Sequence, residues 1–365
     1  MVAAGGTGGH VYPAIAVGHE IRAMAPDCRV AFMGTSSGIE ARLVPAEGFE
    51  FFGVSSGPWR RGHPMTMISG AARAARGALE ARSILKEQGV NVVFSTGGYV
   101  SLPVLSAAVT SGIPIVLHEP NYVPGLVMRL FARAAARITV ASPEAGAFFP
   151  KTKVRVTGVP VRKSLLAKDR AGARSRLDLG QEDFVVLVLG GSQGAVSING
   201  AVVSALPILE KSGRPVSVVW ICGEKSVKNC GPAASGSRLK VRLFPYLDDM
   251  RSALWASDVV VARAGASTAA EILALGLPSV LIPYPHAAGN HQLRNAESLA
   301  QAGAAKVILE ARLSGASLAA EILELAGSPE TLKTLADRAG SLGRPGAARE
   351  VAEEILALAS RTKPC

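Results

Sequence analysis

The chain opens with Val2-Ala3-Ala4-Gly5-Gly6-Thr7-Gly8-Gly9-His10, a stretch whose pattern recurs in the middle of the sequence. Small apolar residues, as in a buried strand, lead into two glycine pairs and then a helical stretch. Further along, the apolar run Phe184–Leu189 enters Gly190-Gly191-Ser192-Gln193-Gly194, again followed by a helical pattern. A strand, a glycine-rich loop and a helix start can together hold a phosphate on backbone N–H groups. Two such segments predict two similar α/β domains.

The other apolar runs are short, do not alternate with polar residues, and are separated by helical patterns. Examples are residues 92–95 and 115–117 in the first half and residues 259–261 in the second. Runs of this kind predict parallel strands buried on both faces by helices. Ligands of such folds bind at the carboxyl ends of the strands. We therefore expect two Rossmann-like domains with parallel sheets that face each other across a ligand-binding cleft.

The length of 365 residues fits two domains. A connection that contains glycine and proline, residues 157–162, suggests where the first domain ends. The expected division is a first domain at 1–157, a second domain at 158–340, and a C-terminal helix at 341–365. That helix could pack on either domain, and we expect it to return to the first.

The composition points to an anionic partner. There are 39 Lys and Arg against 28 Asp and Glu, a net charge of +11. Such a charge favours nucleic acid, acidic lipid or a phosphorylated substrate. Aromatic residues make up only 5% and no nucleic-acid-binding motif is recognised, so nucleic acid is not an expected partner. The longest apolar stretch, residues 101–117, is interrupted by Gly112 and Pro114, which argues against a membrane span.

Candidate catalytic groups follow the strands of the first half. His10 stands where the glycine loop meets the helix and is a candidate general base, although a structural histidine is the alternative. Thr96-Gly97-Gly98-Tyr99 follows one strand and His118-Glu119-Pro120-Asn121 follows the next. Glu119 is therefore a candidate acid, base or cation-stabilising group.

Candidate phosphate and ribose ligands lie in the second half. Ser192 and Gln193 can donate hydrogen bonds to phosphate oxygens. Ser267 and Thr268 resemble N-cap residues of the next helix, whose positive end would favour an anion. Glu271 lies near the first turn of that helix and could accept hydrogen bonds from both hydroxyls of a ribose. A dipole-stabilising acid is the alternative reading of Glu271.

Two amides in the second half suit a sugar. Gln292 and Asn295 are three residues apart and share one face of a predicted helix. Such amides can bind several hydroxyl groups, whereas a solvated helix start is the alternative.

Two common nucleotide-binding classes do not fit. Gly6 and Gly8 are followed by Val11 where the dinucleotide fingerprint requires a third glycine, and Gly34 and Thr35 stand where it requires an acid. No Gly-Lys-Ser/Thr follows either loop, which excludes the P-loop. No Cys/His cluster has zinc spacing, so neither a metal nor a cofactor is expected. A non-catalytic nucleotide-sugar binder is a further alternative, and such a protein would not require His10.

Taken together, the segments GGTGGH, STGGYVSLP, HEPN, PVR, LGGSQGA, RAGAST-x-x-E and HQ-x-x-NA resemble the MurG family, the peptidoglycan glycosyltransferases of bacteria. Each segment is modest alone, but their order and spacing match over essentially the whole chain. The resemblance implies a GT-B fold and an inverting transfer of N-acetylglucosamine without a metal or cofactor. The donor would be UDP-N-acetylglucosamine. The acceptor would be the C4 hydroxyl of the muramyl sugar in lipid I, undecaprenyl-pyrophosphoryl-N-acetylmuramyl pentapeptide, and the product lipid II. A related glycosyltransferase that acts on another glycolipid is the alternative.

The resemblance also assigns roles to individual residues. The first domain would bind the acceptor and the membrane, and the second would bind the UDP-sugar. His10 would be the base, Glu119 its alternative, and Tyr99 an acceptor-side residue. The residues that would bind UDP-N-acetylglucosamine are Thr7, Gly8, Gly9, Asn121, Arg162, Ser192, Gln193, Thr268, Glu271, Gln292 and Asn295. Two positions depart from the family pattern: Val159 replaces an asparagine, which puts a donor-side hydrogen bond in doubt, and Pro120 replaces a glutamine.

Basic residues gather in two places that suit a membrane surface. Between Trp59 and Lys86 there are six basic residues and a single acid, Glu80, with several apolar residues among them. The six are Arg60, Arg61, Arg73, Arg76, Arg82 and Lys86, and the apolar residues are Trp59, Met65, Met67 and Ile68. Arg129, Arg133 and Arg137, at spacings of four, suggest a second basic row on a helix. Solvated helix faces are the alternative. Because the acceptor is lipid-linked, we expect peripheral binding to the anionic cytoplasmic face of the cell membrane, with other cell-wall synthesis proteins as candidate partners.

Overall fold

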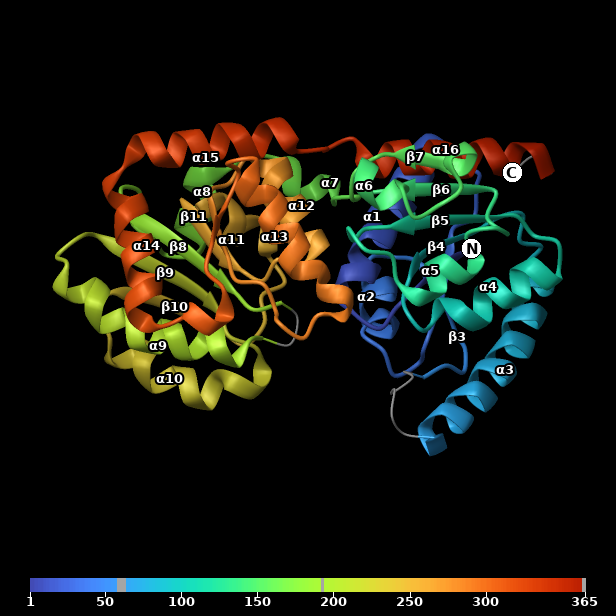
Figure 1. Cartoon of the computed structure of the whole chain (residues 1–365), viewed down its shortest axis with the longest axis horizontal. Coiled ribbons are helices and arrows are strands. Elements are labelled where there is room, and N and C mark those ends of the chain that lie inside the picture. The colour runs from blue at the N-terminus through green and yellow to red at the C-terminus, as the bar shows by residue number, and fades with distance from the viewer. Residues whose placement is uncertain (58–63, 192–193, 363–365) are drawn as a thin grey trace. The chain divides into compact units, whose positions relative to one another are not determined.

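The computed structural model describes residues 1–57, 64–191 and 194–362. The chain divides into two compact units (Figure 1). Unit 1 comprises Met1–Arg162 together with the segment from Arg344 onward, and unit 2 comprises Lys163–Gly343. The first boundary therefore falls at 162/163, where the sequence suggested 157/158, and the chain re-enters unit 1 at 344, where the sequence suggested 341.

Unit 1 is built on a parallel sheet with the strand order β3-β2-β1-β4-β5-β6-β7. Its strands are β1 (Val2–Ala4), β2 (Ala31–Gly34), β3 (Glu50–Gly53), β4 (Val93–Gly97), β5 (Ile115–Glu119), β6 (Arg137–Val140) and β7 (Val154–Val156). Its helices are α1 (Gly8–Met24), α2 (Glu40–Ala46), α3 (Pro64–Glu87), α4 (Ser101–Thr110), α5 (Leu126–Phe131), α6 (Pro143–Gly146) and α16 (Ala347–Thr362), with the 3-10 turn η1 (Lys151–Lys153).

Both faces of this sheet are covered, as the unalternating apolar strands predict. Val2 and Ala4 of β1 pack in a core with residues of α1 and α16, whereas Ala3 points to the opposite face and packs with residues of α3 and α4. The C-terminal helix α16 packs against α1 and lies on unit 1, as the red ribbon shows in Figure 1. Glu354 of α16 forms ion pairs with Arg155 and, at 2.7 Å, with Arg137.

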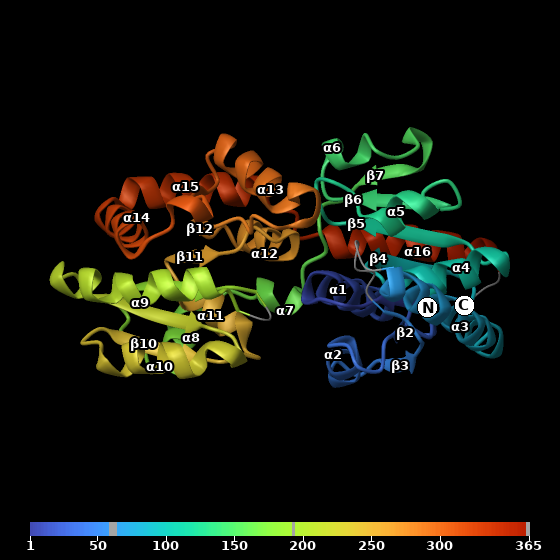
Figure 2. The same cartoon turned by 60° about the horizontal axis from the view of Figure 1, so that its bottom comes forward.

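Unit 2 is built on a second parallel sheet with the strand order β10-β9-β8-β11-β12-β13. Figure 2 labels β10, β11 and β12 of this sheet. Its strands are β8 (Phe184–Leu189), β9 (Val216–Ile221), β10 (Lys240–Phe244), β11 (Val259–Ala262), β12 (Ser279–Leu281) and β13 (Lys306–Val307). Its helices are α7 (Lys163–Leu166), α8 (Arg170–Arg176), α9 (Val196–Lys211), α10 (Val227–Gly236), α11 (Met250–Ala256), α12 (Ala266–Leu275), α13 (His291–Gln301), α14 (Gly315–Gly327) and α15 (Pro329–Leu342). The 3-10 turns are η2 (Glu224–Ser226), η3 (Ala288–Asn290) and η4 (Glu310–Arg312).

The two sheets are wound in the same way, which confirms the expectation of two Rossmann-like units with parallel sheets. In each, the first strand is central, the next two strands extend the sheet to one side, and the following strands extend it to the other. The winding direction reverses between β1 and β4 in unit 1 and between β8 and β11 in unit 2. Ligands of doubly wound sheets bind at such reversal points, and both glycine loops begin there.

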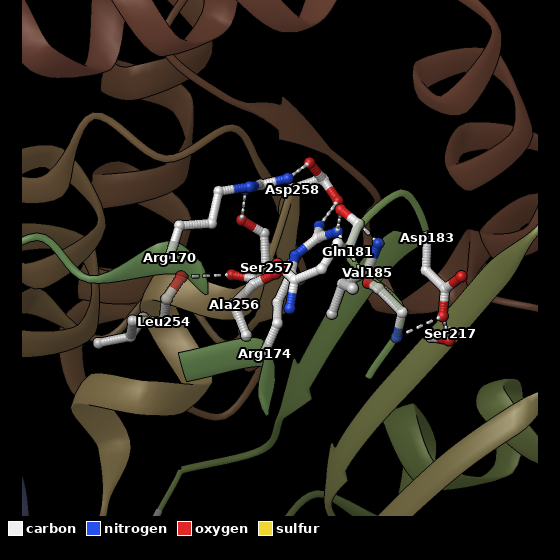
Figure 3. A network of polar contacts seen from close by, with 11 residues as sticks. Arg170, Arg174, Gln181, Asp183, Val185, Ser217, Leu254, Ala256, Ser257 and Asp258 are labelled. Carbon is white, nitrogen blue, oxygen red and sulfur yellow. Dashed lines mark hydrogen bonds and ion pairs between the residues drawn. The ribbon is translucent and has the colours of Figure 1, made fainter. Parts of the chain in front are cut away.

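A buried arginine ties the first helices of unit 2 to its sheet (Figure 3). The Arg174 side chain is 1% exposed and pairs with Asp258, at 2.8 Å, just before β11. Arg174 also donates to the carbonyls of Ala256, Gly180 and Gln181, and Asp258 accepts from the backbone N–H of Val185 at 2.8 Å. Because all three nitrogens of this buried cation donate to oxygens, α8 is fixed against β8 and β11.

One expectation about the basic residues is wrong. Arg129, Arg133 and Arg137 do not form a helical row, because α5 ends at Phe131. Only Arg129 lies in the helix, Arg133 lies in the turn that follows, and Arg137 is the first residue of β6. A spacing of four between basic residues suits a helix, but here it bridges a turn into a strand. In the part of the chain that the structure describes, no helix is long and apolar enough to cross a membrane.

Candidate active site

The site in unit 1 begins with the first glycine loop (residues 5–10), which joins β1 to α1. Thr7 has extended backbone and α1 starts at Gly8. His10, in the first turn, lies with Nδ1 at 2.7 Å from the carbonyl oxygen of Thr96, and the Thr96 hydroxyl donates to the His10 carbonyl at 2.8 Å. Because a carbonyl oxygen only accepts, the proton of a neutral His10 ring sits on Nδ1. Nε2 then carries the lone pair that a general base needs.

The loop after β4 packs directly on the first glycine loop. Gly98 has a φ of +86°, and a Cβ there would lie 2.8 Å from the carbonyl oxygen of Gly5. A side chain at this position would therefore push the two loops apart. The Tyr99 ring lies against Gly6, where an added Cβ would be 3.0 Å from the ring. Tyr99 thus flanks the first glycine loop.

Glu119, at the end of β5, is buried and holds its own loop. Its side chain is 1% exposed. Its carboxylate accepts from the Asn121 backbone N–H at 2.9 Å, from the Asn121 amide at 3.0 Å and from the Gly125 N–H at 3.1 Å. Burial raises the pKa of Glu119 to about 7, against the opposing effect of these hydrogen bonds and of Arg129. The structure therefore brings Glu119 and Asn121 together.

His118 is a buried group to which the sequence analysis gave no role. It is 0% exposed, and its Nδ1 lies 2.9 Å from the Thr139 hydroxyl. Within the described part of the chain, its Nε2 has no hydrogen-bond partner. Burial, and then the nearby His10, lower the pKa of His118 to about 3, so its ring stays neutral at physiological pH. The sequence signal for a buried His118 was its place between Leu117 and Glu119 at the end of an apolar strand.

Arg162 ends the first stretch of unit 1 and lies over α1. Its guanidinium is 4.3 Å from the centre of the Tyr12 ring, two residues after His10. A cation over an aromatic face is held electrostatically, which orients the Arg162 side chain. Val159, the departure from the family pattern, is 7% exposed and so occupies an apolar position.

The corresponding edge of unit 2 carries the second glycine loop (residues 190–195) between β8 and α9. Ser192 and Gln193 lie outside the described residues. Gly194 has a φ of +75°, and a Cβ there would lie 2.2 Å from the carbonyl oxygen of Cys222. This loop therefore lies directly against the backbone that follows β9.

Helix α12, after β11, starts earlier than the sequence suggested. Its N-cap is Gly265, whose backbone is extended and whose carbonyl accepts from the Ala269 N–H at 2.9 Å. Ser267 and Thr268 were expected to be caps, and that expectation is wrong, because both lie inside the first turn. Glu271 lies beyond that turn, which contains no acid. The reading of Glu271 as a first-turn acid that complements the dipole is therefore weakened.

The two amides of α13 are oriented by the protein. Gln292 accepts from the backbone N–H of Tyr284 at 3.0 Å, through Oε1. The Asn295 amide donates to the carbonyl of Ala264 at 3.0 Å. Since Ala264 lies in the turn after β11, Asn295 links α13 to the start of α12. Both amides are thus fixed at the carboxyl edge of neighbouring strands.

Arg263 organises the same edge, although the sequence analysis quoted it without a role. It forms an ion pair with Glu310 and donates to the carbonyl of Ile282 at 3.2 Å and to the Ser197 hydroxyl at 2.9 Å. It thereby joins the segments after β8, β11, β12 and β13. Among the residues that the structure describes, no group of three or more His, Cys, Asp and Glu side chains could hold a metal ion.

The comparisons with known proteins agree over the whole chain. Residues 1–140 match the glycosyltransferase family 28 N-terminal domain and residues 185–351 match its C-terminal domain. The UDP-N-acetylglucosamine--N-acetylmuramyl-(pentapeptide) pyrophosphoryl-undecaprenol N-acetylglucosamine transferase of Moorella thermoacetica is 39% identical over 368 residues, 98% of each chain. The protein of that name from Sorangium cellulosum is 41% identical over 363 residues, 98% of this chain and 88% of the other. The solved structure of Acinetobacter baumannii MurG has a TM-score of 0.73 and 26% identity, over 97% of this chain and 98% of that one.

Two doubly wound units, each with a glycine-rich loop at the point where the sheet reverses, define the GT-B fold class, and the two matched family 28 domains make the chain a glycosyltransferase. The chain belongs to glycosyltransferase family 28 and, within it, to the MurG family represented by these relatives.

Proposed function

We propose that this chain transfers N-acetylglucosamine from UDP-N-acetylglucosamine to the C4 hydroxyl of the N-acetylmuramyl sugar of lipid I. The products would be lipid II and UDP, and the anomeric carbon would be inverted. The observation that carries the proposal is the near-full-length likeness to relatives whose names state this donor and acceptor, at 39% and 41% identity. The oriented polar groups at the carboxyl edges of both sheets support it.

The proposed chemistry needs one base and a stabilised leaving group. The base removes the proton of the C4 hydroxyl while its oxygen bonds to the anomeric carbon, and the bond from that carbon to the diphosphate breaks. His10 suits this role because Thr96 holds its Nδ1 at 2.7 Å and directs the lone pair to Nε2. Glu119 is less suited, since both of its oxygens already accept hydrogen bonds and it is 1% exposed. We infer that Glu119 positions the loop after β5.

The donor would be held by residues of both units. In unit 2, the second glycine loop with Ser192 and Gln193, and the start of α12 with Thr268, would hold the diphosphate, because helix N-termini stabilise anions. Glu271 would accept from the ribose hydroxyls, and the oriented amides of Gln292 and Asn295 would read the sugar. In unit 1, Thr7, Gly8, Gly9, Asn121 and Arg162 would complete the donor site, and Tyr99 would meet the acceptor.

The test is a transfer assay with radiolabelled UDP-N-acetylglucosamine. The acceptors are a short-chain lipid I analogue and, in parallel, a diacylglycerol glycolipid. We expect label to enter only the lipid I analogue, in a product with an inverted linkage at the former C4 hydroxyl. Transfer only to the glycolipid would reject the proposed acceptor. UDP binding without transfer to any acceptor would favour a non-catalytic binder.

We also propose that unit 1 docks on an anionic membrane through a surface that we call the α5 patch, which comprises Leu126, Leu130, Arg129, Arg133 and Phe148. Leu126 and Leu130, one helical turn apart, are 67% and 63% exposed, and Phe148 is 48% exposed. The Arg129 guanidinium lies 5.3 Å from the Phe148 ring. Exposed apolar residues ringed by cations are the pattern that anionic lipid surfaces bind.

Helix α3 adds Leu79, 72% exposed, and the basic residues Arg73, Arg76, Arg82 and Lys86. The expected contributions of Trp59, Arg60 and Arg61, and of the Met65, Met67 and Ile68 side chains, fall outside what the structure describes. Binding to other cell-wall synthesis proteins stays a prediction.

Vesicle flotation tests the α5 patch. The double variant Leu126→Ser/Leu130→Ser should lose binding to vesicles that contain phosphatidylglycerol, whereas Leu309→Ser, at an exposed leucine of unit 2, should retain it. Charge reversal at Arg133 should weaken binding at low salt most, because screening shortens the range of the attraction. Equal flotation of all variants would remove the patch from the proposal.

A further inference from the structure

Glu40, the first residue of α2, is a buried acid that the proposed chemistry does not use. It is 0% exposed. One carboxylate oxygen accepts from the Gly6 backbone N–H at 3.1 Å, and the other accepts from the Thr35 N–H at 3.0 Å and the Thr35 hydroxyl at 2.6 Å. Glu40 therefore joins the first glycine loop to the end of β2.

Three glycines from separate segments make room for this side chain. A Cβ at Gly5 would lie 2.4 Å from a carboxylate oxygen of Glu40, and one at Gly38 would lie 2.2 Å from it. A Cβ at Gly34 would lie 2.6 Å from the Glu40 Cγ. Burying an ionised carboxylate is costly unless hydrogen bonds replace water, so packing alone would be better served by an apolar residue. An acid at this position therefore indicates that its hydrogen bonds, and not its packing, are what the structure requires.

The hydrogen bond from Gly6 to Glu40 controls the backbone direction of the first glycine loop. Gly6 has a φ of +87°, and a Cβ there would lie 3.0 Å from the Tyr99 ring, so only glycine fits this position without strain. Its N–H bond to Glu40 fixes the direction in which the chain continues to Thr7, where the N-terminus of α1 begins. His10 follows within the first turn. A change in the direction of Gly6 would therefore move both the N–H groups of the helix start and the base.

We propose that Glu40 is a positioning residue, which acts through the Gly6 N–H to hold the first glycine loop and His10 in the geometry that transfer requires. The role rests on the proposed function, because it assumes that His10 serves as the base. Glu40 would touch neither donor nor acceptor. Its loss would lower turnover by misplacing groups that do, while leaving the affinity of unit 2 for UDP unchanged.

The test compares Glu40→Gln with Thr35→Val. In Glu40→Gln, the remaining oxygen is expected to stay with the two donors of Thr35, so that the new NH₂ faces the Gly6 N–H and the bond to the loop is lost. Thr35→Val removes a hydrogen bond from the same carboxylate but leaves the bond to Gly6. We expect kcat to fall ~10–100-fold in Glu40→Gln, with the Kd for UDP, whose diphosphate and ribose ligands are proposed in unit 2, within ~3-fold of wild type. Thr35→Val should keep kcat within ~3-fold at a similar loss of Tm.

Hydrogen–deuterium exchange of a peptide that covers the loop gives a readout independent of turnover. Exchange should rise in Glu40→Gln and not in Thr35→Val. The control is Glu47→Gln, at the other end of α2, where the carboxylate pairs with His19 on the surface at 3.0 Å. It should match wild type in kcat and exchange. The proposal would be overturned if kcat fell in both test variants in proportion to their loss of Tm. Wild-type turnover in Glu40→Gln would overturn it as well.

The two proposals fail in different ways. If the wild type does not glycosylate the lipid I analogue, the proposed function fails, and exchange still decides whether Glu40 holds the loop. If the wild type is active and exchange at the loop is the same in Glu40→Gln and wild type, the positioning role fails and the function stands.

Discussion

The two glycine loops occupy the same place in equivalent sheets, yet they differ in what they carry. Aligned on their first glycine pair, Gly5-Gly6-Thr7-Gly8-Gly9-His10 in unit 1 stands against Gly190-Gly191-Ser192-Gln193-Gly194-Ala195 in unit 2, although α1 begins at Gly8 and α9 begins only at Val196. The sixth position is an imidazole held by a carbonyl in one loop and an 8% exposed methyl group in the other. The fold supplies the helix start twice, but it supplies a base only once.

The loops also differ in what supports them. Side-chain hydrogen bonds hold the first loop, because the Glu40 carboxylate accepts from the Gly6 N–H and the Thr96 hydroxyl donates to the His10 carbonyl. In the described part of the second loop, the support is backbone packing, with Gly194 against the carbonyl of Cys222. A loop that presents a reacting side chain needs its orientation fixed, whereas a loop that binds phosphate through N–H groups needs close approach. The comparison therefore predicts that chemistry and donor binding can be separated by mutation.

The largest expected effect is at His10. His10→Ala makes the first loop resemble the second at its sixth position and removes the base. We expect kcat to fall ~10²–10⁴-fold, the usual contribution of general base catalysis. Measured with the lipid I analogue, the loss should be accompanied by an unchanged Kd for UDP in calorimetry. A variant that turns over like wild type would assign the base elsewhere, with Glu119 as the next candidate.

The next effect concerns how the units are stabilised. Asp258→Ala leaves Arg174 as a buried cation without its carboxylate, which typically costs about 3–5 kcal/mol. The matched control is Glu324→Ala, also in unit 2, which removes a surface pair with Lys306 in which the glutamate side chain is 53% exposed; such pairs contribute about 0–1 kcal/mol. Urea unfolding followed by Trp220 and Trp255, both in unit 2, should show a lower midpoint only for Asp258→Ala. Equal midpoints would mean that the backbone carbonyls around Arg174 compensate its charge without Asp258.

The site of unit 1 should respond to pH through Glu119. Its pKa is raised from an ordinary 4.5 to about 7, so the folded state favours the protonated acid. The associated stability is fully present below pH 4.5 and is lost as the pH rises through about 7, by up to about 3 kcal/mol. Glu119→Gln, which cannot ionise, should lack this loss. Urea unfolding at about pH 5.5 and about pH 8.5 should therefore show the wild type weakening relative to the variant at the higher pH. A pH-independent difference would contradict the raised pKa.

Much of the architecture was predictable because each local pattern agreed with the fold. Unalternating apolar runs such as Phe184–Leu189 can be buried only between helices, and glycine pairs after strands fixed both loops. Local patterns failed where tertiary structure decided between good options. Ser267 and Thr268 are both good N-cap residues, but α12 begins earlier, at Ala266, shortly after β11 ends. Arg137 fits a helical spacing, but it is the first residue of β6.

Buried charged residues were the feature of the fold that the sequence predicted least well. Glu40 and Arg174 are types that are almost always exposed, so sequence reasoning assigns them to the surface. Their partners are backbone groups and residues distant in sequence, such as Gly6 and Asp258, which no local pattern reveals. The candidate site could be proposed from motifs that lie at strand ends. The residues that orient it could not.

The smallest expected effect tests the binding side of the comparison. Glu271→Gln keeps the size of the side chain but replaces a charged acceptor for the ribose hydroxyls with a neutral one. A hydrogen bond to a charged group contributes about 1.5–3 kcal/mol and one to a neutral group about 0.5–1.5, so UDP affinity should fall ~10-fold. At saturating donor, kcat should stay near the wild-type value, the reverse of the His10→Ala pattern. If Glu271→Gln instead lowered kcat and left the Kd for UDP unchanged, unit 2 would take part in the chemistry, and the division of labour between the two loops would not hold.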